Sequence, residues 1–106
     1  MTIRERRSNV EELVQKELQE ADSKFSMFHS GYEGAAAIYE SIERAKAEMY
    51  ETEMNFRVLW THVKLNNAVI ASNHADDLHR RACKLACEAI QVAAMAQKFI
   101  DSQKTN

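Results

Sequence analysis

The sequence lacks proline altogether and has only two glycines, Gly31 and Gly34, among its 106 residues. Since proline and glycine are the residues that most often end a helix, their scarcity favours long, uninterrupted helices. No run of apolar residues is long enough to cross a bilayer, and no signal peptide is recognisable. We therefore expect no membrane partner and a cytoplasmic location.

An excess of positive charge is also lacking, because the formal net charge is −2. Nucleic-acid-binding proteins are usually basic, so this charge argues against a nucleic-acid partner. Only two cysteines are present, Cys83 and Cys87. Two further zinc ligands at a standard spacing are missing, and we interpret both cysteines as buried small residues or as bystanders.

The overall composition is that of a small globular domain, with 45% hydrophobic and 28% charged residues. We expect one helical domain over residues 1–106, with residues 1–8 as a frayed N-terminal arm and residues 103–106 as a frayed C-terminus. A chain of this length buries only a small core, so pairing with further copies would stabilise it. We therefore expect a homo-oligomer, a dimer or larger.

The clearest helical pattern runs from Asp76 to Ser102. Its apolar side chains recur at alternating steps of four and three, as on one face of a helix: Leu78, Ala82, Leu85, Ala89, Val92, Ala96 and Phe99. A second apolar line lies beside the first and contains Ala86, Ile90, Ala93 and Ile100. The combined face is too broad for one seam, so this helix should pack against more than one neighbour.

Weaker patterns predict the remaining helices. Ser8 and Glu11 have the spacing of a capping box, which predicts a helix from Ser8 to about residue 24. A second helix is expected over residues 33–53, and a third over residues 54–65, contiguous with the second or kinked from it. A loop is expected over residues 66–74, with Asn66 or Asn67 ending the preceding helix. These segments predict an all-α fold, an antiparallel bundle of three to four helices completed by dimerisation.

Apolar residues of these middle helices indicate which faces are buried. Met49 belongs to an apolar line of the second helix, and Phe56, Leu59, Trp60 and Val63 recur at helical steps in the third. These lines are the apolar faces of the predicted helices. The only tryptophan, Trp60, is interpreted as a core or dimer contact rather than a ligand contact.

The segment from Phe25 to Gly34 is unusually rich in aromatic and hydroxyl side chains for a connection. Two interpretations stay open, and they are compatible with one another. In the first, Phe25 and Phe28 plug one end of the bundle. In the second, the loop stacks on a planar ligand, with Phe28 or Tyr32 against its ring.

Two segments together resemble the MazG-like, all-α nucleoside triphosphate pyrophosphohydrolases. They are residues 28–44, FHSGYEGAAAIYESIER, and residues 88–96, EAIQVAAMA. The resemblance implies an oligomeric helical bundle that hydrolyses a nucleoside triphosphate to a monophosphate and pyrophosphate. It also implies a cluster of carboxylates that holds Mg²⁺, which prefers oxygen ligands and would bridge the phosphates.

The family's acidic motifs, Glu-Glu-x-x-Glu and Glu-x-x-Asp, are only partly kept here. Glu40 and Glu88 match the first acid of each motif, and Glu43 lies one turn from Glu40. The resemblance therefore implies Mg²⁺ ligands at Glu40, Glu43 and Glu88. The side chains expected to contact the nucleotide are Phe28, His29, Tyr32, Arg44 and Gln91.

Three departures from the motifs define two hypotheses. Ser41, Arg44 and Gln91 stand where the family has carboxylates. In the first hypothesis, the protein is a divergent relative that binds a nucleotide, with or without cleaving it, at a weakened Mg²⁺ site. In the second, Arg44 forms a salt bridge with Glu40 or Glu88, and the protein is a catalytically silent bundle for oligomerisation or partner binding. Catalytic residues are not assigned.

Overall fold

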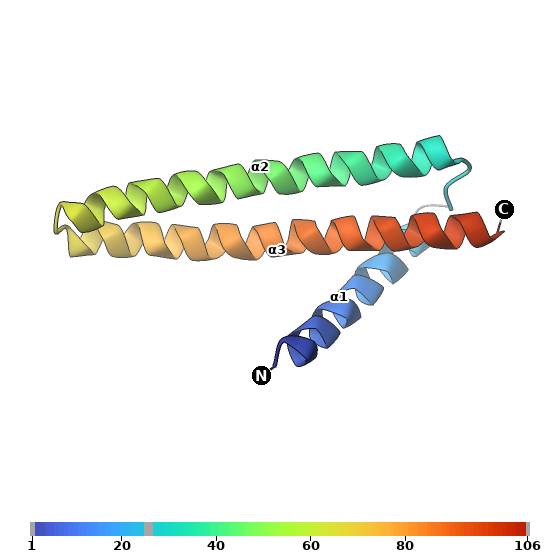
Figure 1. Ribbon diagram of the computed structural model, residues 1–106, viewed down its shortest axis with the longest axis horizontal. Coiled ribbons are helices and arrows are strands. Elements are labelled where there is room, and N and C mark those ends of the chain that lie inside the picture. Colours follow the sequence, from blue (N-terminus) through green and yellow to red (C-terminus); the bar gives the residue numbers. More distant parts are fainter. Residues whose placement is uncertain (1, 25–26, 106) are drawn as a thin grey trace. The chain divides into compact units, whose positions relative to one another are not determined.

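The computed structural model describes residues 2–24 and 27–105. These residues form three helices: α1 (Ile3–Lys24), α2 (Gly31–Lys64) and α3 (Ala68–Thr105) (Figure 1). No strand occurs in either described range. The prediction of an all-α chain is therefore confirmed.

The start of α1 lies five residues before the predicted cap at Ser8. The Glu5 N–H donates to Thr2 Oγ1 at 3.1 Å, and the Thr2 N–H donates to Glu5 Oε2 at 3.2 Å. This reciprocal pair is a capping box, and it satisfies two backbone donors at the helix start. Residues 3–8 are therefore helical rather than a frayed arm. At the other end of the chain, α3 continues to Thr105, so residues 103–105 are helical as well.

Helix α2 runs without a break through the expected boundary at residues 53 and 54. It ends at a short connection in which Asn66 has a φ of 54°, a conformation that asparagine tolerates better than most residues. Asn67 then caps α3, since its Oδ1 accepts a hydrogen bond from the Ile70 N–H at 3.3 Å. The prediction of Asn66 as a helix stop is confirmed, whereas the predicted loop over residues 66–74 is wrong.

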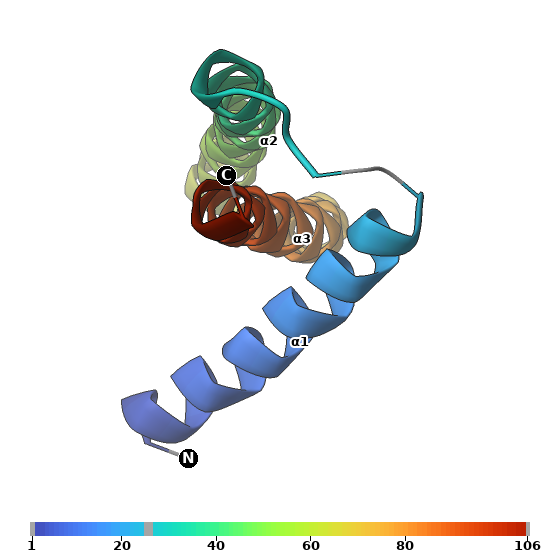
Figure 2. The same cartoon turned by 90° about the vertical axis from the view of Figure 1, so that its right-hand side faces the viewer.

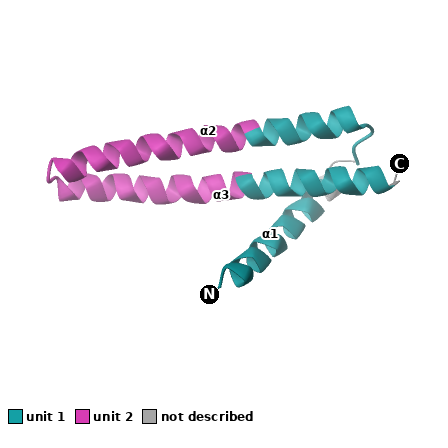
Figure 3. Ribbon diagram, viewed as in Figure 1, with its two compact units in different colours: residues 1–42, 89–106 teal, residues 43–88 magenta. Residues whose placement is uncertain are grey.

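The chain divides into two compact units (Figure 3). Unit 1 comprises Met1–Ile42 and Ala89–Asn106, and unit 2 comprises Glu43–Glu88. Within unit 1, α1 crosses the C-terminal part of α3 (Figure 2). The buried apolar cluster of this unit consists of Leu18, Ala21, Phe28, Ala94 and Met95.

Unit 2 is an antiparallel helical hairpin whose inner side chains are largely polar. The shielded residues recur at steps of three and four on both helices, as in a coiled coil. We call them the polar seam: Ala45, Glu48, Thr52, Asn55, Leu59 and His62 on α2, and Ala71, His74, Leu78, Arg81, Leu85 and Glu88 on α3. Of the four apolar residues 56, 59, 60 and 63 that recur at helical steps, Leu59 is the one that lies in this seam.

The more apolar line of α2 in unit 2 lies outside the hairpin. It contains Met49, Phe56, Trp60 and Val63, which are 45%, 52%, 51% and 46% exposed. We call these four residues the apolar stripe. Trp60 is therefore not a core residue of the hairpin, and its other interpretation, a dimer contact, stays a prediction. Each of them directly follows a seam residue in the sequence, which places the stripe about 100° around the helix from the seam.

Replacement of Gly34 by alanine is expected to destabilise the protein by about 1–3 kcal/mol. A Cβ atom at Gly34 would lie 2.5 Å from Phe99 Cδ2 and 3.1 Å from Phe28 Cδ2, so both rings would have to shift. Gly31→Ala is the matched control, because nothing lies within 4 Å of a Cβ at that position. Urea unfolding followed by circular dichroism measures both. Equal stability of the two variants would contradict the packing described for unit 1.

Candidate functional site

Two of the three predicted Mg²⁺ ligands, Glu43 and Glu88, lie in unit 2 together with Arg44. Arg44 Nε lies 3.6 Å from Glu88 Oε2, across the hairpin from α2 to α3. The side chains are 47% and 23% exposed, so the ion pair is partly shielded from solvent. The guanidinium therefore supplies a positive charge next to Glu88, at the carboxylate where a metal ion was expected.

Glu43 also has a cationic neighbour. Lys46 Nζ lies 3.4 Å from Glu43 Oε1, at an i,i+3 spacing on the surface of α2. Glu40 and Gln91, the other two members of the predicted acidic motifs, lie in unit 1. Glu40 is exposed and Gln91 is half-buried. The binding of Mg²⁺ by Glu40, Glu43 and Glu88 stays a prediction.

Phe28 is part of the core of unit 1, where it is 8% exposed. Its N–H donates to Ser102 Oγ at 3.1 Å, and Lys98 Nζ lies 5.0 Å from the centre of its ring. These contacts fix the backbone and the ring before any ligand is present. The interpretation of Phe28 as a packing residue is therefore confirmed, while Phe25 lies outside the described residues.

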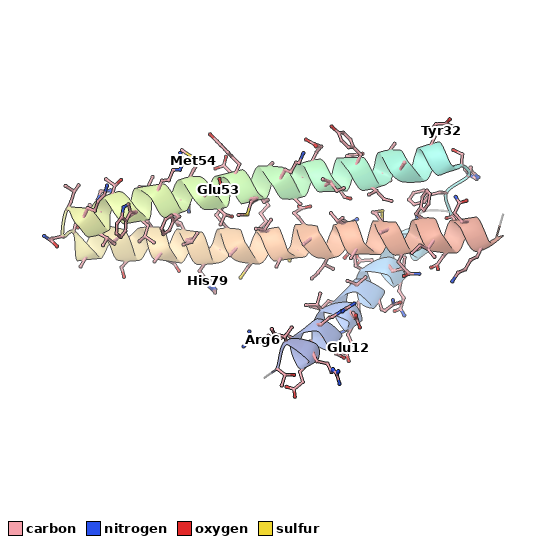
Figure 4. All side chains as sticks on the ribbon, in the orientation of Figure 1. Arg6, Glu12, Tyr32, Glu53, Met54 and His79 are labelled. Carbon is pink, nitrogen blue, oxygen red and sulfur yellow. The ribbon has the colours of Figure 1, made fainter. Side chains whose placement is uncertain are left out.

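His29 and Tyr32 lie on the surface near the start of α2. The His29 N–H donates to Glu33 Oε2 at 3.2 Å, and the Glu33 N–H donates to Ser30 Oγ at 3.2 Å, so this segment caps the helix. Tyr32 is 91% exposed and projects from the end of α2 (Figure 4). Contact of His29 or Tyr32 with a nucleotide stays a prediction.

A buried carboxylate at Glu48 was not recognised from the sequence. Its Oε1 lies 3.0 Å from Lys84 Nζ, and its Oε2 lies 3.8 Å from Arg81 Nη1. Arg81 also approaches Glu51, at 4.0 Å. The only signal available was the spacing, since Glu48 is three residues after Ala45 on the line that faces α3. This cluster joins α2 to α3 by charge, where a helical hairpin usually has apolar contacts.

A pair of histidines lies in the same seam, close to the end of the hairpin. The rings of His62 and His74 stack with their centres 5.3 Å apart and their planes 13° apart. The buried Nδ1 atom of His62 has no hydrogen-bond partner from any described residue. Polar contacts between α2 and α3 thus occur from the Arg44–Glu88 ion pair near one end of unit 2 to the two histidines near the other.

The two cysteines and His79 are further side chains of types that commonly bind metal ions. Within residues 2–24 and 27–105, no three His, Cys, Asp or Glu side chains are grouped so that they would hold a metal ion. Cys83 and Cys87 are exposed, so they are not the buried small residues that one interpretation expected. His79 Nε2 lies 3.9 Å from Cys83 Sγ. The His79 side chain points away from α2 (Figure 4).

No protein-family model, curated protein or solved structure matches this chain. The resemblance to the MazG-like pyrophosphohydrolases therefore stays a prediction. None of the helices in the described part of the chain has both the length and the apolar character that crossing a bilayer requires.

Replacement of Glu48 by alanine is expected to cost about 1–3 kcal/mol of stability, because Lys84 and Arg81 lose the acceptor that they share. Glu51→Ala is the control, since Glu51 is exposed and only 4.0 Å from Arg81, and its effect should stay within about 0.5 kcal/mol. Urea unfolding at neutral pH provides both values. A cost for Glu48→Ala no larger than that for Glu51→Ala would show that the seam does not depend on this charge.

Proposed function

We propose that this protein is a helical binding module that holds a helical partner against the apolar stripe of α2. The supporting observation is the exposure of four large side chains in one line: Met49, Phe56, Trp60 and Val63. An exposed line of large apolar side chains on a helix is typical of helix-docking surfaces, in which anchors recur at helical spacing. Aromatic side chains such as Phe56 and Trp60 contribute most of the binding free energy in such interfaces.

The ion pair of Arg44 and Glu88 favours this proposal over nucleotide hydrolysis by the MazG-like mechanism. That mechanism needs several carboxylates around a metal ion that bridges the phosphates. Here the guanidinium lies 3.6 Å from Glu88, so it neutralises that carboxylate and would repel a second cation. The proposal therefore assigns Arg44 and Glu88 to the packing of α2 against α3.

The stripe is expected to be covered in the cell and open in dilute solution. Oxidative footprinting compares the reactivity of Met49 and Trp60 in purified, dilute protein and in cells that contain it. Met54 is the control, because it is 36% exposed on the same helix and points away from α3 (Figure 4). We expect Met49 and Trp60, but not Met54, to be protected at least about fivefold in cells, since buried side chains exclude the oxidant. Equal reactivity of all three in both settings would overturn the proposal.

Nucleoside triphosphates are expected to be left intact by the protein. The measurement is pyrophosphate release from a panel of ribo- and deoxyribonucleoside triphosphates with Mg²⁺, compared with a blank without protein. A variant with Glu88→Gln is the control for contaminating enzymes, because it removes the carboxylate that the hydrolytic mechanism would need. Release by the original protein that disappears in this variant would establish the nucleotide hypothesis instead.

A further inference from the structure

Unit 2 buries very little apolar surface for a hairpin of its length. Ala71, which is 8% exposed, is the one apolar residue of unit 2 that is buried. The leucines of the seam, Leu59, Leu78 and Leu85, are only half-buried. Because apolar burial is the main favourable contribution to folding, such a hairpin gains substantially from any contact that covers the apolar stripe.

Two charged residues of opposite sign share the helical line of the stripe: Glu53 lies within the stripe, and Lys46 lies just before its first residue. Lys46 lies three residues before Met49, and Glu53 lies four residues after it. Both are one helical turn from Met49, on the same line of α2. Lys46 also lies 3.4 Å from Glu43 of its own helix, so an occupant that presents a positive group near Glu53 and a negative group near Lys46 would extend an existing pair of charges.

A second pair of charges flanks the line with the opposite order of signs. Glu43 precedes Tyr50 by seven residues, and Arg57 follows it by seven. Both residues are exposed. On these two lines of α2 the charges thus read negative, positive, negative, positive, and they are arranged almost symmetrically about the midpoint between Met49 and Tyr50; Arg44, Glu48 and Glu51 lie on other lines of the helix.

This pattern is complementary to itself when two copies run in opposite directions. With a two-fold axis at Met49–Tyr50, Lys46 of one copy meets Glu53 of the other, and Glu43 meets Arg57, each contact occurring twice. In a parallel arrangement every one of these residues would meet its own twin and be repelled. The second copy also brings its own Met49 and Phe56 to the stripe.

We infer that a second copy of this chain occupies the part of the apolar stripe that contains Met49 and Phe56, bound through α2 in antiparallel orientation about Met49–Tyr50, while Trp60 and Val63 lie beyond this contact. This inference rests on the proposed function and names the partner of that surface. The segment from Glu43 to Arg57 is about 21 Å long at 1.5 Å per residue, which makes a small interface. We therefore expect a reversible dimer with a dissociation constant of about 1–100 µM.

Sedimentation velocity of the full chain between about 1 and 500 µM tests the inference, since this range brackets the expected dissociation constant. The original protein should change from monomer to dimer across it. Phe56→Glu should weaken the dimer at least about tenfold, because it places a charge in the apolar contact. Val58→Glu is the matched control: Val58 is also exposed, at 38%, but lies about 180° around α2 from Met49. Circular dichroism confirms that both variants remain helical.

Charge reversal tests the orientation. Lys46→Glu alone and Glu53→Lys alone should each weaken the dimer about fivefold, since each creates two like-charge contacts across the axis. The double variant Lys46→Glu, Glu53→Lys should restore the original affinity. If the single variants dimerise like the original protein, or if the double variant does not recover, the antiparallel arrangement is wrong.

The outcomes separate this inference from the proposed function. A protein that stays monomeric at every concentration, but whose Met49 and Trp60 are protected in cells, overturns the second copy as the occupant and leaves the docking surface standing. Dimerisation that is abolished by Val58→Glu and unaffected by Phe56→Glu overturns both proposals, because a different face would then be the interface.

Discussion

The contact between Glu48 and Lys84 determines how unit 2 is arranged. A carboxylate inside a helical hairpin is costly unless a cation reaches it, and Lys84 Nζ does so at 3.0 Å, with Arg81 close by. Glu48 therefore turns towards α3, and Thr52, Asn55 and His62 follow because they share its line on α2. The line that contains Met49, Phe56, Trp60 and Val63 is consequently left on the outside.

The same requirement accounts for Arg44 and Glu88. Glu88 is the last seam residue of α3, and Arg44 precedes the first seam residue of α2. Arg44 Nε lies 3.6 Å from Glu88 Oε2, so the two side chains form an ion pair between α2 and α3. A seam of polar side chains stabilises a hairpin less than an apolar one, but it tolerates only those pairings in which each charge finds its partner. Packing thus gives a physical reason for an arginine and a glutamate at these two positions.

Much of the helical architecture follows from the sequence, but the orientation of the helices does not. The scarcity of glycine and proline predicts long helices, and Asn66 marks the end of α2. Capping is ambiguous, because Thr2 with Glu5 and Ser8 with Glu11 have the same spacing, and only the first pair forms the cap. Apolarity favours the line through Trp60 as the inner face of α2, whereas the observed face depends on partners that α3 supplies, such as Lys84 for Glu48 and His74 for His62.

The connection of Leu65–Asn67 has a bearing on how this hairpin would tolerate insertions and deletions. On α2 the seam and the stripe are neighbouring lines, offset by a single residue. Insertion of one residue into α2 beside the connection would rotate the helix by about 100° relative to α3, and would turn Trp60 inwards and Glu48 towards the solvent. The number of residues in α2 before the connection therefore determines which line of the helix faces α3 and which faces the solvent. An insertion there would bury the apolar stripe and expose the line that contains Glu48.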